Sequence, residues 1–120
     1  MSDNKDLGKW GEQYAKEELL KKGLKFIASN FTFKKLEIDL IFLDVKKKEI
    51  VFVEVKTRTS DYFGDPEEAI HLHKQRNLRN CASIFLKLNK EFENCSIRYD
   101  SFAIIKLKDE IKTRHIENSF

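Results

Sequence analysis

Three charged residues lie inside two apolar stretches of this sequence, and their types and spacing could support hydrolytic chemistry. Asp39 lies within residues 36–44, and Glu54 and Lys56 lie within residues 49–58. Side chains alternate between the two faces of a β-strand, so Glu54 and Lys56 are expected on the same face. If the chain turns back between these stretches, they pair as a hairpin and Asp39 can share that face. The pattern predicts two carboxylates and an ammonium group in one small area.

Such a group of charges needs compensation. Two carboxylates about 4 Å apart repel by roughly 4 kcal/mol at an effective dielectric constant of about 20, so folding requires a nearby cation. Lys56 is one candidate, and a divalent metal ion is another. Oxygen ligands with no histidine or thiolate beside them suit Mg²⁺ or Mn²⁺ better than zinc. The residues alone leave a structural ion pair and a metal site both open.

The elements before the hairpin are expected to be a helix and a strand. Residues 6–22 carry apolar side chains at helical spacing, and Gly23 is a typical residue to end that helix. Glu12 lies at the inward edge of the apolar face, although the helix dipole alone also favours an acid in the first turns. Residues 24–33 predict a strand. In the first strand of the hairpin, alternation places Ile38 on the same face as Leu40 and Phe42.

The second half of the chain predicts a loop, a helix and a strand. The polar residues 57–65 interrupt all periodicity, and Asp65-Pro66-Glu67-Glu68 has the residue order of a helix start. This helix is expected to extend to about Asn89. Lys74 and Gln75 precede Leu78 by one turn, so at least one of them is expected to face the sheet, although a basic helix segment is also typical of a solvated face. Residues 96–107 predict a strand, and residues 114–116 a short one.

Length and composition limit the class of protein. With 120 residues, 41% apolar and 36% charged, the chain is expected to form one globular, soluble domain over residues 1–120. A net charge of +3, with 23 lysines and arginines, permits nucleic-acid binding without requiring it. No stretch has the length and apolarity of a membrane span or a signal peptide, so a cytoplasmic protein without membrane contact is expected. Cys81 and Cys95 form no CxxC motif and are expected to be ordinary core or surface residues.

Five segments carry a family resemblance, in this order along the chain: GKWGEQYAKEELLKKGLKFIASNF, LEIDLIFLD, VFVEVKTR, FGDPEEAIHLHKQRNLRNCA and RYDSFAI. Together they resemble the YraN-like family of uncharacterised endonuclease-like bacterial proteins. That family belongs to the PD-(D/E)xK nuclease superfamily and is similar to the archaeal Holliday-junction resolvases. The resemblance implies a restriction-endonuclease-like α/β fold, a mixed β-sheet flanked by helices in the order α-β-β-β-α-β. The elements expected from the residues follow the same order. Leu36 departs from the family, which has glycine before the Glu-x-Asp triplet.

The resemblance also implies an activity, metal-dependent hydrolysis of phosphodiester bonds in double-stranded, branched or damaged DNA. Asp39, Glu54 and the backbone carbonyl of Val55 would hold Mg²⁺ or Mn²⁺, with Glu12 reached through water, and Lys56 would orient the attacking water. Gln75 corresponds to a polar helix residue that faces the site. The implied phosphate contacts are Arg58, Tyr62, Lys74, Arg76 and Arg79.

Two other functions stay open at this stage. A non-catalytic nucleic-acid-binding or adaptor module could keep the same fold, and a protein-interaction domain could use Glu54 and Lys56 only as a structural ion pair. A homodimer is a further expectation, because enzymes that cut two strands symmetrically usually work as two-fold dimers.

Overall fold

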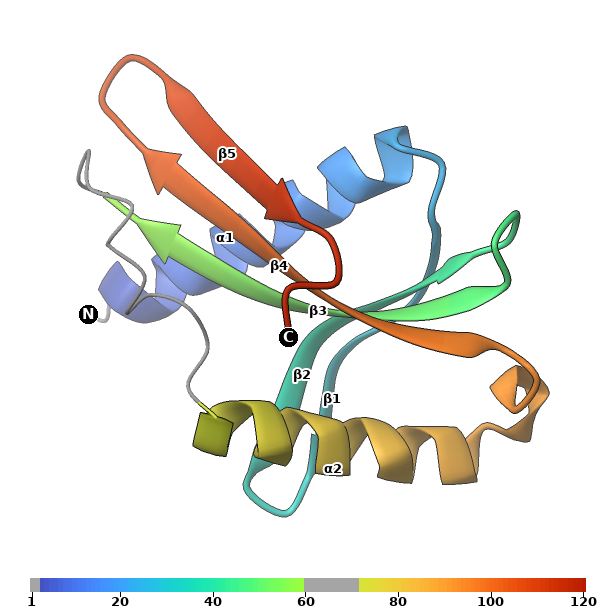
Figure 1. The fold of residues 1–120 in the computed structure, drawn as a ribbon. Helices are drawn as coiled ribbons and strands as arrows, with labels where there is room; N and C mark the ends of the chain where they lie inside the picture. Colours follow the sequence, from blue (N-terminus) through green and yellow to red (C-terminus); the bar gives the residue numbers. More distant parts are fainter. Residues whose placement is uncertain (1–2, 60–71) are drawn as a thin grey trace.

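The chain folds around one mixed five-stranded β-sheet, and the computed structural model describes residues 3–59 and 72–120. The strand order in the sheet is β1-β2-β3-β4-β5, with β3 and β4 parallel and the other neighbours antiparallel. In chain order the described helices and strands are α1 (Asp3–Lys21), β1 (Lys25–Phe33), β2 (Leu36–Asp44), β3 (Glu49–Arg58), α2 (Leu72–Leu88), the 3₁₀ turn η2 (Lys90–Phe92), β4 (Ser96–Lys106) and β5 (Ile111–Ile116). This arrangement confirms the predicted α/β class with the order helix, three strands, helix, strand, and β5 lies at the edge of the sheet (Figure 1).

The first three strands form a meander held by short turns. Between β2 and β3 the backbone N–H of Lys47 donates to the Asp44 carboxylate at 3.1 Å, and Lys48 has a φ of 53°. Asp44 therefore supplies the side-chain hydrogen bond that closes this basic turn. The predicted hairpin of β2 and β3 is confirmed.

Two apolar clusters lie on opposite faces of the sheet, each under one helix. The α1-side cluster contains Ala15, Leu19, Leu24, Leu40, Phe42, Val51, Val53, Phe102 and Ile104. The α2-side cluster contains Ile38, Ile41, Ile50, Phe52, Leu78, Cys81, Ala82, Phe85 and Phe92. Because β3 is central and covered on both faces, its residues 50–54 are all buried. The sheet and its two helices thus form the rigid scaffold for side chains at the ends of these strands.

The structure corrects several expected boundaries. Thr57 and Arg58 belong to β3 and are not the start of a loop, because they continue the parallel pairing with Ile104 and Ile105 of β4. The predicted helix start at Asp65 lies outside the described residues, and α2 ends at Leu88. The predicted three-residue strand at 114–116 is a six-residue strand, Ile111–Ile116.

Ile38 departs from the expected alternation. It packs in the α2-side cluster with Ile41, whereas Leu40 and Phe42 lie in the α1-side cluster. The recorded pairing of β2 with β3 ends at Leu40, while the pairing of β2 with β1 continues to Leu36. A two-stranded ribbon twists more strongly than a wide sheet, and this twist turns Ile38 toward α2. In Figure 1 the β1–β2 ribbon accordingly bends away from β3 and reaches under α2.

Neither helix of the described residues is long and apolar enough to span a bilayer.

Candidate functional site

The candidate site lies where β2 and β3 separate. Their antiparallel pairing extends from Asp44 and Glu49 to Leu40 and Val53. Just beyond this last pair, the backbone N–H of Val55 donates to Oδ2 of Asp39 at 2.8 Å. The Asp39 carboxylate therefore accepts a hydrogen bond from a backbone N–H of β3 at the point where the strands diverge. This hydrogen bond fixes Asp39 against the β3 backbone.

Asp39 and Glu54 are both buried, each with 8% of its surface exposed. Burial, followed by the repulsion of Glu54, raises the pKa of Asp39 from its usual value of 3.8 to about 8. The Val55 hydrogen bond opposes this rise in pKa, while Glu12 and Glu37 add to it. The structure thus brings Glu12 of α1, Asp39 of β2 and Glu54 of β3 into one electrostatic group, as the sequence predicted for Asp39 and Glu54.

Glu37 is a member of this acid cluster that the sequence reasoning did not single out. Burial, followed by repulsion from Glu12 and Glu54, raises its pKa, and a hydrogen bond from Asn30 lowers it. Asn30 also donates from Nδ2 to Oε1 of Glu12 at 3.0 Å, and its φ of 51° marks a bend in β1. Glu37 precedes Asp39 by two residues, so the strand period was the signal that could have identified it. We call Glu12, Glu37, Asp39 and Glu54 the acid cluster.

Lys74 supplies the cation that the paired carboxylates require. Its Nζ lies 2.6 Å from Oε1 of Glu54, and the Lys74 side chain is 51% exposed whereas that of Glu54 is 9% exposed. Lys56 is half-buried and follows Glu54 on the same strand face. Gln75 is half-buried one turn before the buried Leu78, which places it toward the sheet. Lys74, which was predicted as a phosphate contact, is therefore the observed ion-pair partner of Glu54.

A close contact between α1 and β3 positions Glu12. Gly11 is buried, and a Cβ atom at this position would lie 1.9 Å from Oγ1 of Thr57 and 3.0 Å from its Cβ. Only glycine permits so close an approach of the helix to the strand. The next residue, Glu12, is thereby brought to the edge of the acid cluster.

A hollow of about 390 Å³ opens beside the acid cluster. Its lining includes Glu12 and Val55 from the candidate site, and Thr57, Arg58 and Thr59 from the end of β3. Arg58, predicted as a phosphate contact, therefore lines the same hollow as Glu12. Its Nη1 donates to the carbonyl of Thr57 at 3.3 Å.

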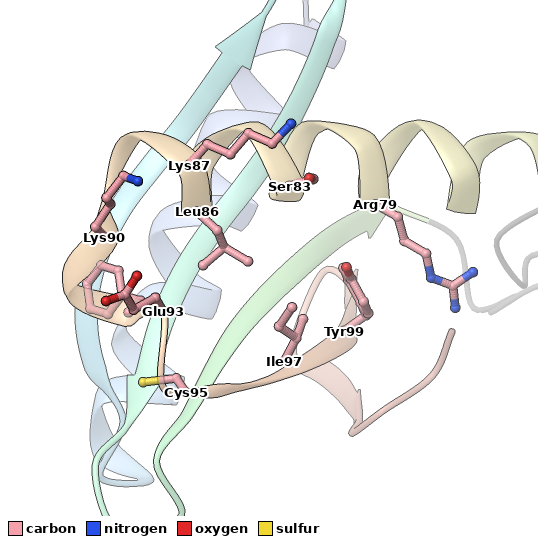
Figure 2. A pocket seen from close by; sticks show the side chains of 10 residues that line it. Arg79, Ser83, Leu86, Lys87, Lys90, Glu93, Cys95, Ile97 and Tyr99 are labelled. Atoms are coloured by element: carbon pink, nitrogen blue, oxygen red, sulfur yellow. The ribbon is translucent and has the colours of Figure 1, made fainter.

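Among the described residues, the predicted phosphate contacts Lys74, Arg76 and Arg79 do not line this hollow. Arg76 is exposed on α2, and Tyr62 lies outside the described residues. Arg79 lies with its guanidinium 5.4 Å from the ring centre of Tyr99. It lines a separate cleft of about 380 Å³ between α2 and β4, which Figure 2 shows with Lys87 on α2 and Lys90 on the η2 turn that follows.

The donor atoms of the acid cluster suit one type of metal ion. In the part of the chain that the structure describes, no group of three or more His, Cys, Asp or Glu side chains is placed to enclose a metal ion. Asp39 and Glu54 offer two oxygen ligands beside the backbone of Val55. Mg²⁺ is usually bound by one or two carboxylates and keeps several waters, so this oxygen donor set fits Mg²⁺ or Mn²⁺ and does not fit zinc.

The fold and this site define an α/β protein with a single mixed sheet and clustered carboxylates where its second and third strands separate. The sequence profile of the uncharacterised protein family UPF0102 matches residues 11–104. The chain belongs to this family. It is 42% identical to a UPF0102 protein of Syntrophomonas wolfei over 117 residues, which covers 98% of this chain and 99% of the relative. It is 40% identical over 121 residues to a UPF0102 protein of Caldanaerobacter subterraneus, covering 98% of this chain and 97% of that one.

Proposed function

We propose that this protein is a metal-dependent endonuclease that hydrolyses phosphodiester bonds in DNA, with branched or damaged DNA as its substrate class. The observation that carries the proposal is the buried pair of Asp39 and Glu54 where β2 leaves β3, with Lys56 next along the same face. A carboxylate pair that repels in a buried place destabilises the fold, and a functional requirement for the pair explains its presence.

The residues of the site would divide the work as follows. Asp39, Glu54 and the carbonyl of Val55 would hold Mg²⁺ or Mn²⁺, with Glu12 acting through water. When bound, this ion would polarise the scissile phosphate and lower the pKa of a coordinated water. Lys56 would orient the attacking water and stabilise the negative charge that develops on the phosphate oxygens. The N–H of Val55 holds the Asp39 carboxylate in a fixed orientation at 2.8 Å.

Residues of α2 and the end of β3 would position the DNA. Lys74 is half-exposed while its Nζ contacts Glu54, so the same side chain can approach a phosphate entering the site. Gln75 would face the reacting groups, and Arg58 and Arg76 would contact neighbouring phosphates. Phosphate contacts set the position and register of DNA without reading its sequence, which suits an enzyme that recognises DNA structure. Symmetric cutting of two strands would require two copies of the chain.

The test is a cleavage assay on labelled linear duplex, single-stranded, flap and four-way-junction DNA with Mg²⁺ or Mn²⁺. Asp39→Asn and Lys56→Ala are expected to lower the rate by about a hundredfold or more. Lys87→Ala, in the cleft between α2 and β4, is the control and should cleave like the wild type. Cleavage retained in Asp39→Asn and Lys56→Ala would indicate a contaminating nuclease, and a wild type that cuts none of the four substrates would refute the proposal.

Metal binding has a readout that does not depend on activity. A ligand that binds only the folded state stabilises it by about 2.7 kcal/mol when present at about one hundred times its dissociation constant. Saturating Mg²⁺ is therefore expected to raise the urea midpoint of the wild type and not that of Asp39→Asn. Equal shifts in both proteins would remove Asp39 from the proposed ligand set.

A second candidate function is a non-catalytic nucleic-acid-binding or adaptor module. The ion pair of Lys74 with Glu54 at 2.6 Å favours it, because this contact already compensates one carboxylate without a metal. Such a module would bind DNA with a steep salt dependence, lose affinity when Arg76 and Arg79 are neutralised, and bind equally well after Asp39→Asn. Metal-dependent cleavage by the wild type would exclude it.

A further inference from the structure

We propose that the candidate site continues into a groove that holds an unpaired strand of nucleic acid beside the cleavage point. This inference rests on the proposed function and specifies its substrate. It would make DNA with a single-stranded segment, such as a flap or a tailed duplex, the preferred ligand over continuous duplex.

The groove consists of two adjoining hollows. The hollow at Glu12 and Val55 has a volume of about 390 Å³, and a second hollow has a volume of about 770 Å³. Leu7 and Thr59 line both, so the two hollows adjoin at these residues. Ligand pockets typically have volumes of about 300 to 1,000 Å³, so each hollow has room for more than a phosphate contact on a flat surface.

The second hollow lies at the ends of β3 and β4, which their parallel pairing brings together. The two strands run side by side to Arg58 and Ile105, so the residues that follow each of them emerge together. Figure 1 shows the N-terminal part of α1 beside these two strand ends. The second hollow is accordingly lined from three places in the chain, by Asp6, Leu7, Trp10, Thr59, Lys106, Leu107 and Lys108.

The charge along the groove suits a phosphate backbone. Beyond Glu12, its lining carries the cations Arg58, Lys106 and Lys108 against the single acid Asp6. Lys106 and Lys108 are exposed at the end of β4 and in the following turn, where the Leu107 N–H donates to the Glu110 carbonyl at 2.8 Å. A strand leaving the acid cluster would therefore meet positive charge along its path.

The floor of the second hollow distinguishes an unpaired strand from a duplex. Its apolar part contains the half-buried Trp10, with Nζ of Lys106 at 4.7 Å from the ring centre. A duplex offers phosphates and sugars at its outer surface and keeps its bases stacked inside. An unpaired base can instead stack on an aromatic ring while its phosphate takes the lysine, the combination that single-strand-binding grooves use.

The test is binding of a labelled blunt duplex and of the same duplex with a single-stranded tail, measured by fluorescence anisotropy in EDTA. The wild type is expected to bind the tailed duplex at least about fivefold more tightly, the contribution of one stacked base. The double variant Lys106→Gln with Lys108→Gln should lose most of this preference. The magnitude of its logarithmic salt slope on the tailed duplex should fall by about 1.4, because each single-strand phosphate contact contributes about 0.7.

The matched control removes the same charge from the cleft in Figure 2. Lys87 and Lys90 line this cleft, and the double variant Lys87→Gln with Lys90→Gln should keep the wild-type preference for the tailed duplex. Trp10 is the only tryptophan of the chain, so its fluorescence reports on the groove directly. The tailed duplex should protect Trp10 from acrylamide quenching more than the blunt duplex does. Equal affinity of the wild type for the two duplexes would refute the proposed groove. So would an equal loss of the preference for the tailed duplex in both double variants.

Different results would refute the proposed groove and the proposed nuclease activity. Binding in EDTA requires no hydrolysis, so a tail preference without cleavage would keep the groove and refute the enzyme. Metal-dependent cleavage at equal rates with and without a tail would keep the enzyme and refute the groove.

Discussion

Two buried acids on opposite sides of β3, Asp39 of β2 and Asp100 of β4, have opposite electrostatic surroundings. Asp100 is fully buried and accepts hydrogen bonds from Arg98 at 2.9 and 3.0 Å, from His115 at 2.8 Å and from the Asn118 N–H at 2.9 Å. Burial acts to raise its pKa, but the hydrogen bonds from His115, Arg98 and Asn118 lower the pKa below its usual value.

Asp39 accepts a hydrogen bond from the Val55 N–H, but burial, followed by the repulsion of Glu54, raises its pKa to about 8. The ionised form of the same residue type is therefore stabilised at Asp100 and destabilised at Asp39. Compensation is what a structural acid needs, and uncompensated charge is what a cation-binding acid needs. The comparison assigns a structural role to Asp100.

The largest expected effect is at Asp100. Asp100→Ala leaves Arg98, which is 5% exposed, without its bidentate partner, and breaking a buried ion pair costs about 3 to 5 kcal/mol. Urea unfolding at neutral pH measures this loss. Asp39→Ala, which relieves repulsion in the acid cluster, should leave stability unchanged or raise it.

If Asp100→Ala does not fold, the double variant Arg98→Met with Asp100→Leu keeps the comparison testable. Replacing both partners of a buried pair by apolar residues of similar size is often neutral, so this variant should be more stable than Asp100→Ala. If Asp100→Ala is as stable as the wild type, Asp100 is not a structural centre of the fold.

The second prediction uses the opposite pH dependence of the two acids. Asp39 has a pKa raised to about 8 when folded, so the folded state binds more protons than the unfolded state between the usual value of 3.8 and about 8. Its contribution to stability is present at low pH and is lost as the pH rises through this range. One unit of pKa corresponds to about 1.4 kcal/mol, so Asp39→Asn is expected to be more stable than the wild type at alkaline pH by a few kcal/mol.

Unfolding free energies at acidic and alkaline pH, in EDTA, measure this effect. The gain from Asp39→Asn should shrink as the pH falls toward the acidic end. Asp100 has the opposite sign, since its lowered pKa gives stability above the usual value that is lost as the pH falls. A pH-independent effect of Asp39→Asn would contradict the description of the acid cluster.

The approach of Asp39 to Glu54 was predictable because a short basic turn folds the two apolar strands that carry these acids into a hairpin. Lys74 as the partner of Glu54 was not predictable in that way, because the contact depends on how α2 lies over the sheet. Glu37 was missed because it is an exposed residue near the start of β2 and resembles an ordinary polar side chain. The polar composition of Thr57 and Arg58 predicted a loop, but their pairing with β4 extends β3 to Arg58.

The network at Asp100 also depends on distant residues. Arg98 and Asp100 lie two residues apart on β4, but His115 and Asn118 come from β5 and the residues after it. No local pattern connects these segments, and only the pairing of β4 with β5 brings them together. Sequence reasoning therefore located Asp39 and Glu54 better than it located the network of Asp100.

The smallest expected effect concerns the close contact of α1 with β3 at Gly11. Gly11→Ala places a Cβ atom 1.9 Å from Oγ1 of Thr57 and 3.0 Å from its Cβ, so rotating the threonine cannot relieve the whole overlap. Forcing an extra carbon into a packed contact costs about 1 to 3 kcal/mol. The displaced helix carries Glu12, so Mg²⁺ should also stabilise this variant less than the wild type.

Gly8 on the same helix gives the matched control. A Cβ atom there meets nothing within 4 Å, and alanine favours a helix over glycine by about 1 kcal/mol, so Gly8→Ala should be slightly stabilising. Thr57→Gly removes the atoms that the added methyl group would meet and should restore part of the loss in the Gly11→Ala background. If Gly11→Ala and Gly8→Ala behaved alike in urea unfolding, the contact between α1 and β3 would not be what holds Glu12 at the acid cluster.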